Sequence, residues 1–291
     1  MGNLLGWSWT TIAHGQHRLN APLLAATAFL AIRSMITKRA NIDRPAPSVE
    51  TLAISRIIGH LTAMDFRKLK PLLTRLGKFV PEKVIHNLNG ILNYLYVGRW
   101  MSTRGYVPAR RFSKREDLHK YLGSCHASDP VTYLEFGVYR GDSLRLWSQL
   151  LQHPSSQLHG FDSFEGLPES WVLSCDKGAF NVDGVMPTFS DTRVILHKGW
   201  FSDTVPPFLD GFRPAGLLVV HLDADLYSST IFVLTRLKPY LTPSTVLVFD
   251  EFFDRNHELK ALDEFLADTP TLRLNCIAAT DDLAQVAFTI Q

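Results

Sequence analysis

The sequence lacks the features of several special classes of protein. Its 291 residues include only 3 cysteines, Cys125, Cys175 and Cys276. An odd number at wide spacing gives neither a disulfide framework nor a zinc site. The uncharged apolar run 21–32 is shorter than the roughly 20 residues that a membrane-spanning helix needs. We therefore expect a globular chain in a reducing, cytoplasmic compartment.

Acidic residues are scarce in the first part of the chain. Residues 1–112 hold 16 Lys and Arg against 4 Asp and Glu, a net charge of +12. Residues 113–291 hold 14 against 24, a net charge of −10, which together give the +2 of the whole chain. This asymmetry predicts a basic, mainly helical N-terminal region over 1–112 and a second domain over 113–291.

The N-terminal region has no metal-ligand or nucleophile spacing. Its apolar run 21–32, followed by basic residues, is typical of a segment that lies in a membrane interface. A helix docked on the second domain is the favoured interpretation of that run, and a solvated face is the usual interpretation of the basic residues. We expect no nucleic-acid partner. Peripheral membrane contact through residues 21–112 and a homo-oligomer stay open.

The second domain alternates short apolar runs with helical patterns. This alternation predicts an α/β fold, a doubly wound, mainly parallel Rossmann-like sheet of seven strands. A helix over 111–122, with Ser113 as its N-cap, leads into the sheet. The strands are expected to begin at Val131 and to lie at 157–162, 193–197, 217–223 and 244–250, with a closing hairpin over 271–277 and 283–290.

The first strand ends in Glu135 and a turn with glycines at Gly137 and Gly141. This spacing is not the G-x-G-x-x-G of dinucleotide sites, and Glu135 would repel a pyrophosphate but suits a sulfonium or amino group. Asp162 ends the second strand, where an acid in doubly wound sheets accepts hydrogen bonds from ribose hydroxyls. Together they predict a nucleoside pocket; a structural turn with incidental acids is the alternative.

Four acids follow two other strands. Asp223 and Asp225 come after the fourth strand, and Asp250 and Glu251 after the fifth. Adjacent strands lie about 4.8 Å apart, so these carboxylates converge at one edge of the sheet. Gathered like charges need a cation, and an oxygen-only cluster suits Mg²⁺. Helix N-caps are the alternative.

With these residues in hand, the segment 113–291 resembles a class I S-adenosylmethionine-dependent methyltransferase. Within that superfamily it is similar to the macrocin O-methyltransferase group, which methylates sugar hydroxyls. The similar stretches are EFGVYRG at 135–141, GFDSFEGLP at 160–168, KGWFSDTVP at 198–206, HLDADLYSST at 221–230 and FDEF at 249–252.

The resemblance implies S-adenosylmethionine and Mg²⁺ as cofactors and a role for each matched position. The cofactor would be held by Glu135, Gly137, Gly141, Ser143, Asp162, Ser163, Trp200 and Phe201, with the methionine end at Glu135, the ribose at Asp162 and the adenine near Trp200. Asp223, Asp250 and Glu251 would hold Mg²⁺. Glu251 departs from the family, which usually has two aspartates after strand five.

The expected reaction is in-line methyl transfer to a hydroxyl of a small molecule or glycan, with Asp223 or Asp225 as the base. His257 is a weaker candidate base. A catechol-type acceptor is an alternative, although Leu226 stands where those enzymes need a lysine. A nucleotide-binding scaffold without chemistry, docked through the basic N-terminal region, is another. A dehydrogenase is disfavoured by Glu135 and by the glycine spacing.

Overall fold

The computed structural model describes Gly59, residues 65–172 and residues 175–291. The apolar run 21–32 and most of the helical pattern expected before residue 65 lie outside these ranges. The chain divides into two compact units, one reaching to Phe79 and one beginning at Val80. The division into 1–112 and 113–291 stays a prediction. Among the described residues, no helix is long and apolar enough to span a bilayer.

The described residues of the first unit include one whole helix, α3 (Phe66–Gly77). Asp65 caps it, because its side chain accepts the backbone N–H of Arg67 at 3.1 Å. Leu72, Leu73 and Leu76 of this helix are exposed to solvent.

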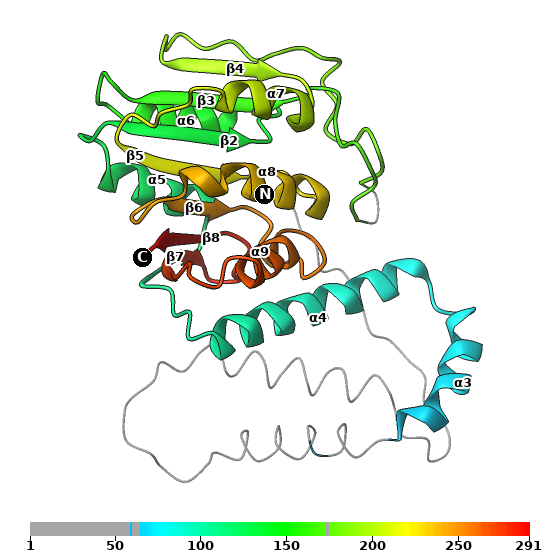
Figure 1. Ribbon diagram of the computed structural model, residues 1–291. Helices are drawn as coiled ribbons and strands as arrows, with labels where there is room; N and C mark the ends of the chain where they lie inside the picture. Colours follow the sequence, from blue (N-terminus) through cyan, green and yellow to red (C-terminus); the bar gives the residue numbers. More distant parts are fainter. Residues whose placement is uncertain (1–58, 60–64, 173–174) are drawn as a thin grey trace, which may run out of the picture. The chain divides into compact units, whose positions relative to one another are not determined.

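The second unit is built on one eight-stranded sheet in the order β1-β7-β8-β6-β5-β2-β3-β4 (Figure 1). All neighbouring pairs are parallel except those that involve β8. The strands are β1 (Arg110–Phe112), β2 (Val131–Phe136), β3 (Gln157–Asp162), β4 (Val194–Lys198), β5 (Leu217–Leu222), β6 (Val246–Phe249), β7 (Leu274–Thr280) and β8 (Val286–Ile290). The mainly parallel α/β sheet and its closing antiparallel hairpin are confirmed.

The expectation of seven strands and of a helix from residue 111 was wrong. Residues Arg110–Phe112 form the extra strand β1, parallel to β7 at the edge of the sheet. Helix α5 (Arg115–Cys125) therefore starts later, with Lys114 and not Ser113 at its N-cap position. A three-residue strand shows no period in the sequence, and it forms because β7 offers an open edge for pairing.

Helices cover both faces of the sheet (Figure 1). Side chains of α5 and α6 (Asp142–Leu150) pack on one face, with Leu118 and Trp147 in that core. The other face is covered by α7 (Phe201–Leu209), α8 (Tyr227–Leu237), α9 (Glu258–Ala267) and the C-terminal half of α4 (Glu82–Thr103). A short 3-10 helix, η1 (Lys238–Tyr240), follows α8. Strands β2 and β6 are buried along their whole length, which explains the continuous apolar run of β6.

The strand order determines where a ligand binds. β2 lies between β5 and β3, and the chain leaves it toward β3 through α6, so the crossovers diverge at the carboxyl end of β2. Open α/β sheets bind ligands at such a switch point. Backbone hydrogen bonds from Asp223 N–H to the Phe136 carbonyl and from Asp250 N–H to the Leu222 carbonyl, both 3.0 Å, carry the strand pairing into this edge.

Candidate active site

A cavity of about 600 Å³ opens at the carboxyl edge of β2, β3, β5 and β6. Pockets of 300–1,000 Å³ are typical of small-ligand sites. Ten of the twelve site residues predicted from the sequence line it: Gly137, Ser143, Asp162, Ser163, Trp200, Phe201, Asp223, Asp225, Asp250 and Glu251. Glu135 and Gly141 do not line it.

The glycine turn after β2 brings the backbone of two strands into contact. Gly137 has φ +98°, and a Cβ there would lie 1.8 Å from the Asp223 carbonyl oxygen. Gly141 begins α6 with φ +78°, and its Cβ would lie 2.8 Å from the ring of Phe189. Only glycine fits either position, since other residues are strained at positive φ and would clash. Gly141 therefore shapes the cavity from behind its wall.

Glu135 supports the cavity wall from below. Its side chain is fully buried; one carboxylate oxygen accepts the Ser143 hydroxyl at 2.7 Å and the other accepts the Tyr133 hydroxyl at 2.6 Å. Ser143 lines the cavity. Glu135 therefore contacts Ser143 and does not line the cavity itself, whereas the resemblance implies that it holds the cofactor directly.

Asp162 holds the glycine turn against the end of β3. Its Oδ2 accepts the backbone N–H groups of Val138 at 2.8 Å and Tyr139 at 2.7 Å, and its Oδ1 accepts that of Phe164 at 2.7 Å. A carboxylate offers about four acceptor positions, so Asp162 keeps capacity for a ribose hydroxyl. The residue that orients the turn is thus also placed for a nucleoside.

Three acids at the other end of the cavity converge. Asp223, Asp225 and Glu251 each offer a carboxylate oxygen, and these oxygens lie within 4.8 Å of one another. The predicted metal set contained Asp250 in place of Asp225. Asp225 takes part because its left-handed backbone, φ +58°, follows directly on β5, whereas Asp250 Oδ1 faces Arg115 and two histidines.

The carboxylates of Asp223, Asp225 and Glu251, here called the acid cluster, are not fully neutralised by nearby positive charge. Burial, and then the Asp250 carboxylate, raise the pKa of Asp225 to about 7, and the same two causes raise the pKa of Glu251 and of Asp223 well above the usual range. Glu251 Oε2 is buried without a hydrogen-bond partner among the described residues. A hard divalent cation satisfies such an oxygen and stabilises the ionised acids, so these side chains fit Mg²⁺.

Arg115, which the sequence analysis missed, bridges two of the acids. Its Nη2 donates to Asp223 Oδ2 at 2.6 Å and its Nε donates to Asp250 Oδ1 at 2.7 Å. Burial lowers the pKa of Arg115, but the carboxylates of Asp250 and Asp223 outweigh that effect and raise it. Arg115 lies 108 and 135 residues from these partners in the sequence, so no local sequence pattern predicts these two ion pairs.

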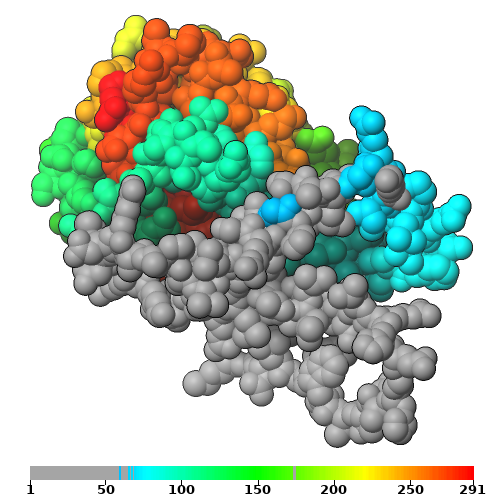
Figure 2. Space-filling model, turned by 90° about the horizontal axis from the view of Figure 1, so that it is seen from below, coloured from blue at the N-terminus to red at the C-terminus, as the bar shows by residue number. Residues whose placement is uncertain are grey.

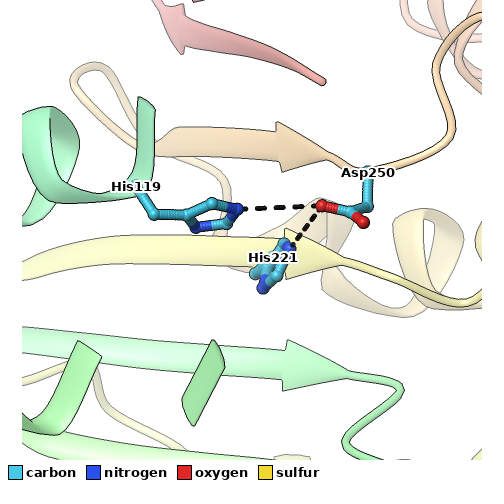
Figure 3. A group of neighbouring side chains, drawn as sticks. All are labelled: His119, His221 and Asp250. Atoms are coloured by element: carbon cyan, nitrogen blue, oxygen red, sulfur yellow. Dashed lines mark ion pairs between the residues drawn. The ribbon is translucent and has the colours of Figure 1, made fainter. Parts of the chain in front are cut away.

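Two histidines behind Asp250 complete its surroundings (Figure 3). His119 from α5 and His221 from β5 both point at the Asp250 carboxylate, with Nε2 atoms 3.7 and 3.5 Å from Oδ1. Burial would raise the pKa of Asp250, but these imidazoles and Arg115 outweigh it and hold that pKa well below its usual range. Asp250 is therefore the carboxylate that stays ionised.

The same three residues do not make a second metal centre, although their ligand atoms are close enough. The Trp147 indole N–H donates to His119 Nδ1 at 2.9 Å. Indole can only donate, so His119 Nδ1 is the acceptor and the neutral ring carries its proton on Nε2. A metal at that Nε2 would need a doubly deprotonated ring beside the Arg115 guanidinium.

The remaining predictions about the site concern its mouth. His257, the weaker candidate base, does not line the cavity; its Nδ1 faces the Tyr227 backbone N–H at 3.3 Å. Phe180, in the loop that follows Cys175, does line it, together with Tyr139 and Trp171, which the sequence did not single out. These three rings give the cavity an aromatic wall.

The fold and cavity define a class, a Rossmann-like α/β domain with a ligand site at the carboxyl ends of its central strands. Residues 134–252, less than half of the chain, match a family model described as a methyltransferase domain. The match spans the strands from β2 to β6 and confirms the expectation of a methyltransferase domain in this segment.

The chain is also similar to individual proteins. Over 161 residues it is 29% identical to the 8-demethyl-8-(2,3-dimethoxy-alpha-L-rhamnosyl)-tetracenomycin-C 4'-O-methyltransferase of Streptomyces olivaceus, which covers 48% of this chain and 60% of that protein. The chain thus matches less than two thirds of that relative.

Two solved structures are similar in outline. The calicheamicin methyltransferase CalS11 is 18% identical with a TM-score of 0.46, covering 96% of this chain and 99% of that one. The O-methyltransferase NovP is 22% identical with a TM-score of 0.44, covering 70% of this chain and 98% of that one.

Proposed function

We propose that this chain is an S-adenosylmethionine-dependent O-methyltransferase that acts on a hydroxyl of a sugar or glycosylated small molecule. One observation carries the proposal: a single cavity joins the glycine turn and Asp162, which suit a nucleoside, to the acid cluster of Asp223, Asp225 and Glu251. The methyltransferase-domain match over 134–252 supports the reaction class. The rhamnosyl group in the name of the 29% identical relative supports a sugar acceptor, as in the macrocin group.

S-adenosylmethionine supplies an electrophilic methyl group on a sulfonium sulfur. The glycine turn and Asp162 would hold its nucleoside part, and Ser143, oriented by Glu135, would face its methionine part. With both substrates bound, the acceptor oxygen would displace the sulfonium sulfur from the methyl carbon, and the bonding electrons would stay on sulfur. The chain contributes mainly by holding the two atoms in line.

The acceptor hydroxyl must lose a proton, and Asp225 is the group placed to take it. It lines the cavity, and a carboxylate oxygen that does not hold a cation can accept the proton. Mg²⁺ held by Asp223, Asp225 and Glu251 would supply positive charge that makes the hydroxyl more acidic. Asp223 is the second candidate base.

Two alternatives are disfavoured by specific residues. A catechol-type enzyme would need a base three residues after Asp223, but Leu226 there is fully buried. A scaffold without chemistry has no use for three converging acids, because their repulsion costs stability that no function would offset.

Isothermal titration with S-adenosylhomocysteine, with and without Mg²⁺, tests the proposal. We expect micromolar binding that Asp162→Ala and Asp162→Asn both weaken by about tenfold or more. Asp203→Ala is the matched control, since Asp203 does not line the cavity. Circular dichroism checks that the variants are folded. Absence of binding by the folded wild-type chain would eliminate the methyltransferase function.

A further inference from the structure

Helix α3 carries an exposed apolar stripe. Leu72, Leu73 and Leu76 are 52, 56 and 48% exposed, and Phe79, just after the helix, is 74% exposed. At 100° per residue these side chains lie within about 120° of one another around the axis. Exposed leucines in such a continuous stripe mark a surface that binds something apolar.

Basic residues occupy the rest of the same helix. The helix and its C-terminal flank contain Arg67, Lys68, Lys70, Arg75 and Lys78, and no acid lies between Asp65 and Glu82. The side chains of Arg67, Lys70, Arg75 and Lys78 are directed away from the leucine stripe by the same helical geometry. The cyan atoms of this segment lie open on the face seen in Figure 2.

Helix α4, in the second unit, repeats the combination independently. Val84, Leu88, Ile91 and Leu95 follow each other at helical spacing and are 44–58% exposed, whereas in the C-terminal half of the helix the opposite side, with Val97, is buried in the core. That half of the helix is buried on one side and apolar on the other, so it lacks the polar outer face of an ordinary surface helix. Residues 83–115 contain seven Lys and Arg and no acid.

We propose that α3 and the exposed stripe of α4 each bind the surface of a bilayer that contains anionic lipids. The leucine and isoleucine side chains enter the boundary between headgroups and acyl chains, and the Lys and Arg side chains pair with lipid phosphates. A second copy of the chain is a poorer partner, because both copies would bring the same positive charge. Nucleic acid is a poorer partner too, because it is bound mainly through its phosphates and would not bury the exposed leucines. This docking surface is independent of the proposed methyl transfer.

Co-sedimentation of the full chain with vesicles tests the proposal. With vesicles of phosphatidylcholine and about one-third phosphatidylglycerol we expect binding, with little binding to phosphatidylcholine alone. The double substitution Leu72→Ser and Leu76→Ser should lower the partition coefficient about tenfold, because two inserted side chains are lost. Lys70→Glu with Lys78→Glu should do the same at low salt, and 0.5 M salt should weaken the wild type.

Matched controls separate docking from general effects. Ile195→Ser replaces a side chain of the same 48% exposure on the methyltransferase-like domain, and it should leave the partition coefficient unchanged. All substituted residues are exposed, so the affinity for S-adenosylhomocysteine and the melting temperature should be the same in the variants and the wild type. Equal binding by the leucine variant and the Ile195→Ser control would overturn the proposal. The proposal would also be overturned if light scattering showed that the chain is a dimer, that vesicles do not bind this dimer and that the leucine substitutions dissociate it.

Discussion

At the scale of single residues, contacts at a few positions determine which residue type can be accepted there. Gly137 and Gly178 both have positive φ, +98° and +86°, yet only the first faces another backbone atom, the Asp223 carbonyl oxygen. Alanine substitutions at these two positions therefore separate two free-energy costs. The strain of positive φ applies at both positions, and the steric clash applies only at Gly137.

We expect Gly137→Ala to destabilise the domain by about 3 kcal/mol or more, since the strain of positive φ is joined by a clash that backbone movement must relieve. Gly178→Ala meets nothing within 4 Å and should cost about 1 kcal/mol. Urea denaturation measures both free energies of unfolding. Equal losses would show that the turn relaxes freely.

Arg115 is a built-in cation beside the acid cluster. Its replacement in Arg115→Gln removes one positive charge next to Asp223 and Asp250, so we expect Mn²⁺ to bind about tenfold more tightly. Electron paramagnetic resonance of free Mn²⁺ measures this affinity without reference to activity. Lys114→Gln, the adjacent exposed cation, is the control. Weaker Mn²⁺ binding in Arg115→Gln would mean that Arg115 positions the metal ligands and does not compete with the ion.

His159 gives the fold a defined pH dependence. It is hydrogen-bonded to His197 at 3.0 Å, and burial, followed by the His197 ring, lowers its pKa to about 4. The unfolded chain binds this proton near pH 6.5, so stability falls as the pH drops from about 6.5 toward 4 and is fully present above that window.

We expect His159→Gln to lose less stability than the wild type between pH 7.5 and pH 5, because that variant has no imidazole to protonate on unfolding. Urea midpoints at the two pH values measure the difference. His86→Gln, at an exposed position of α4, should behave like the wild type. An equal drop in His159→Gln and the wild type would show that other groups carry the pH dependence.

At the scale of elements, α4 belongs to the second compact unit and is more than a lead-in. The Trp100 indole N–H donates to Asp263 of α9 at 2.8 Å, and Arg104 forms an ion pair with the same carboxylate. Trp100 also packs edge-on against Phe252, with ring centroids 5.6 Å apart. The C-terminal half of α4 is therefore bound to the sheet through α9 and the β6–α9 connection.

Truncation of the Trp100 side chain should destabilise the domain. Trp100→Ala is expected to lower the free energy of unfolding by about 3–5 kcal/mol, since it leaves a cavity and removes the indole hydrogen bond to Asp263. Tyr96→Ala, on the exposed part of the same helix, should cost less than about 1 kcal/mol. Thermal unfolding distinguishes them, and a small effect at Trp100 would show that α4 is only loosely attached.

At the scale of the whole molecule, charge is distributed unevenly, with acids gathered at the sheet edge and basic residues before residue 113. The folded state raises the pKa of Asp225 to about 7, so it retains a proton that the unfolded chain releases near 3.9. For this group, stability is therefore highest at low pH and falls as the pH rises toward 7.

We expect Mg²⁺ to reverse that loss. It competes with protons for the acid cluster, so the rise in melting temperature that Mg²⁺ produces should be larger at pH 8 than at pH 6. Differential scanning calorimetry with Mg²⁺ or EDTA measures it. Glu251→Gln should reduce the effect, whereas Glu165→Gln, outside the acid cluster, should not. A Mg²⁺ effect that is independent of pH would remove the acid cluster as its source.

The sequence by itself determined the elements and the kinds of chemical group at their ends. Strand β3 was predicted at its observed bounds, and Asp162, Asp223 and Asp250 were placed at one edge, because period and turn residues are local properties of the chain. The tertiary structure alone decided that Arg115 bridges two acids, that Asp225 and not Asp250 joins Asp223 and Glu251 in the acid cluster, and that Glu135 lies behind Ser143. Those contacts depend on strand order and side-chain direction, and they join residues that the sequence keeps far apart.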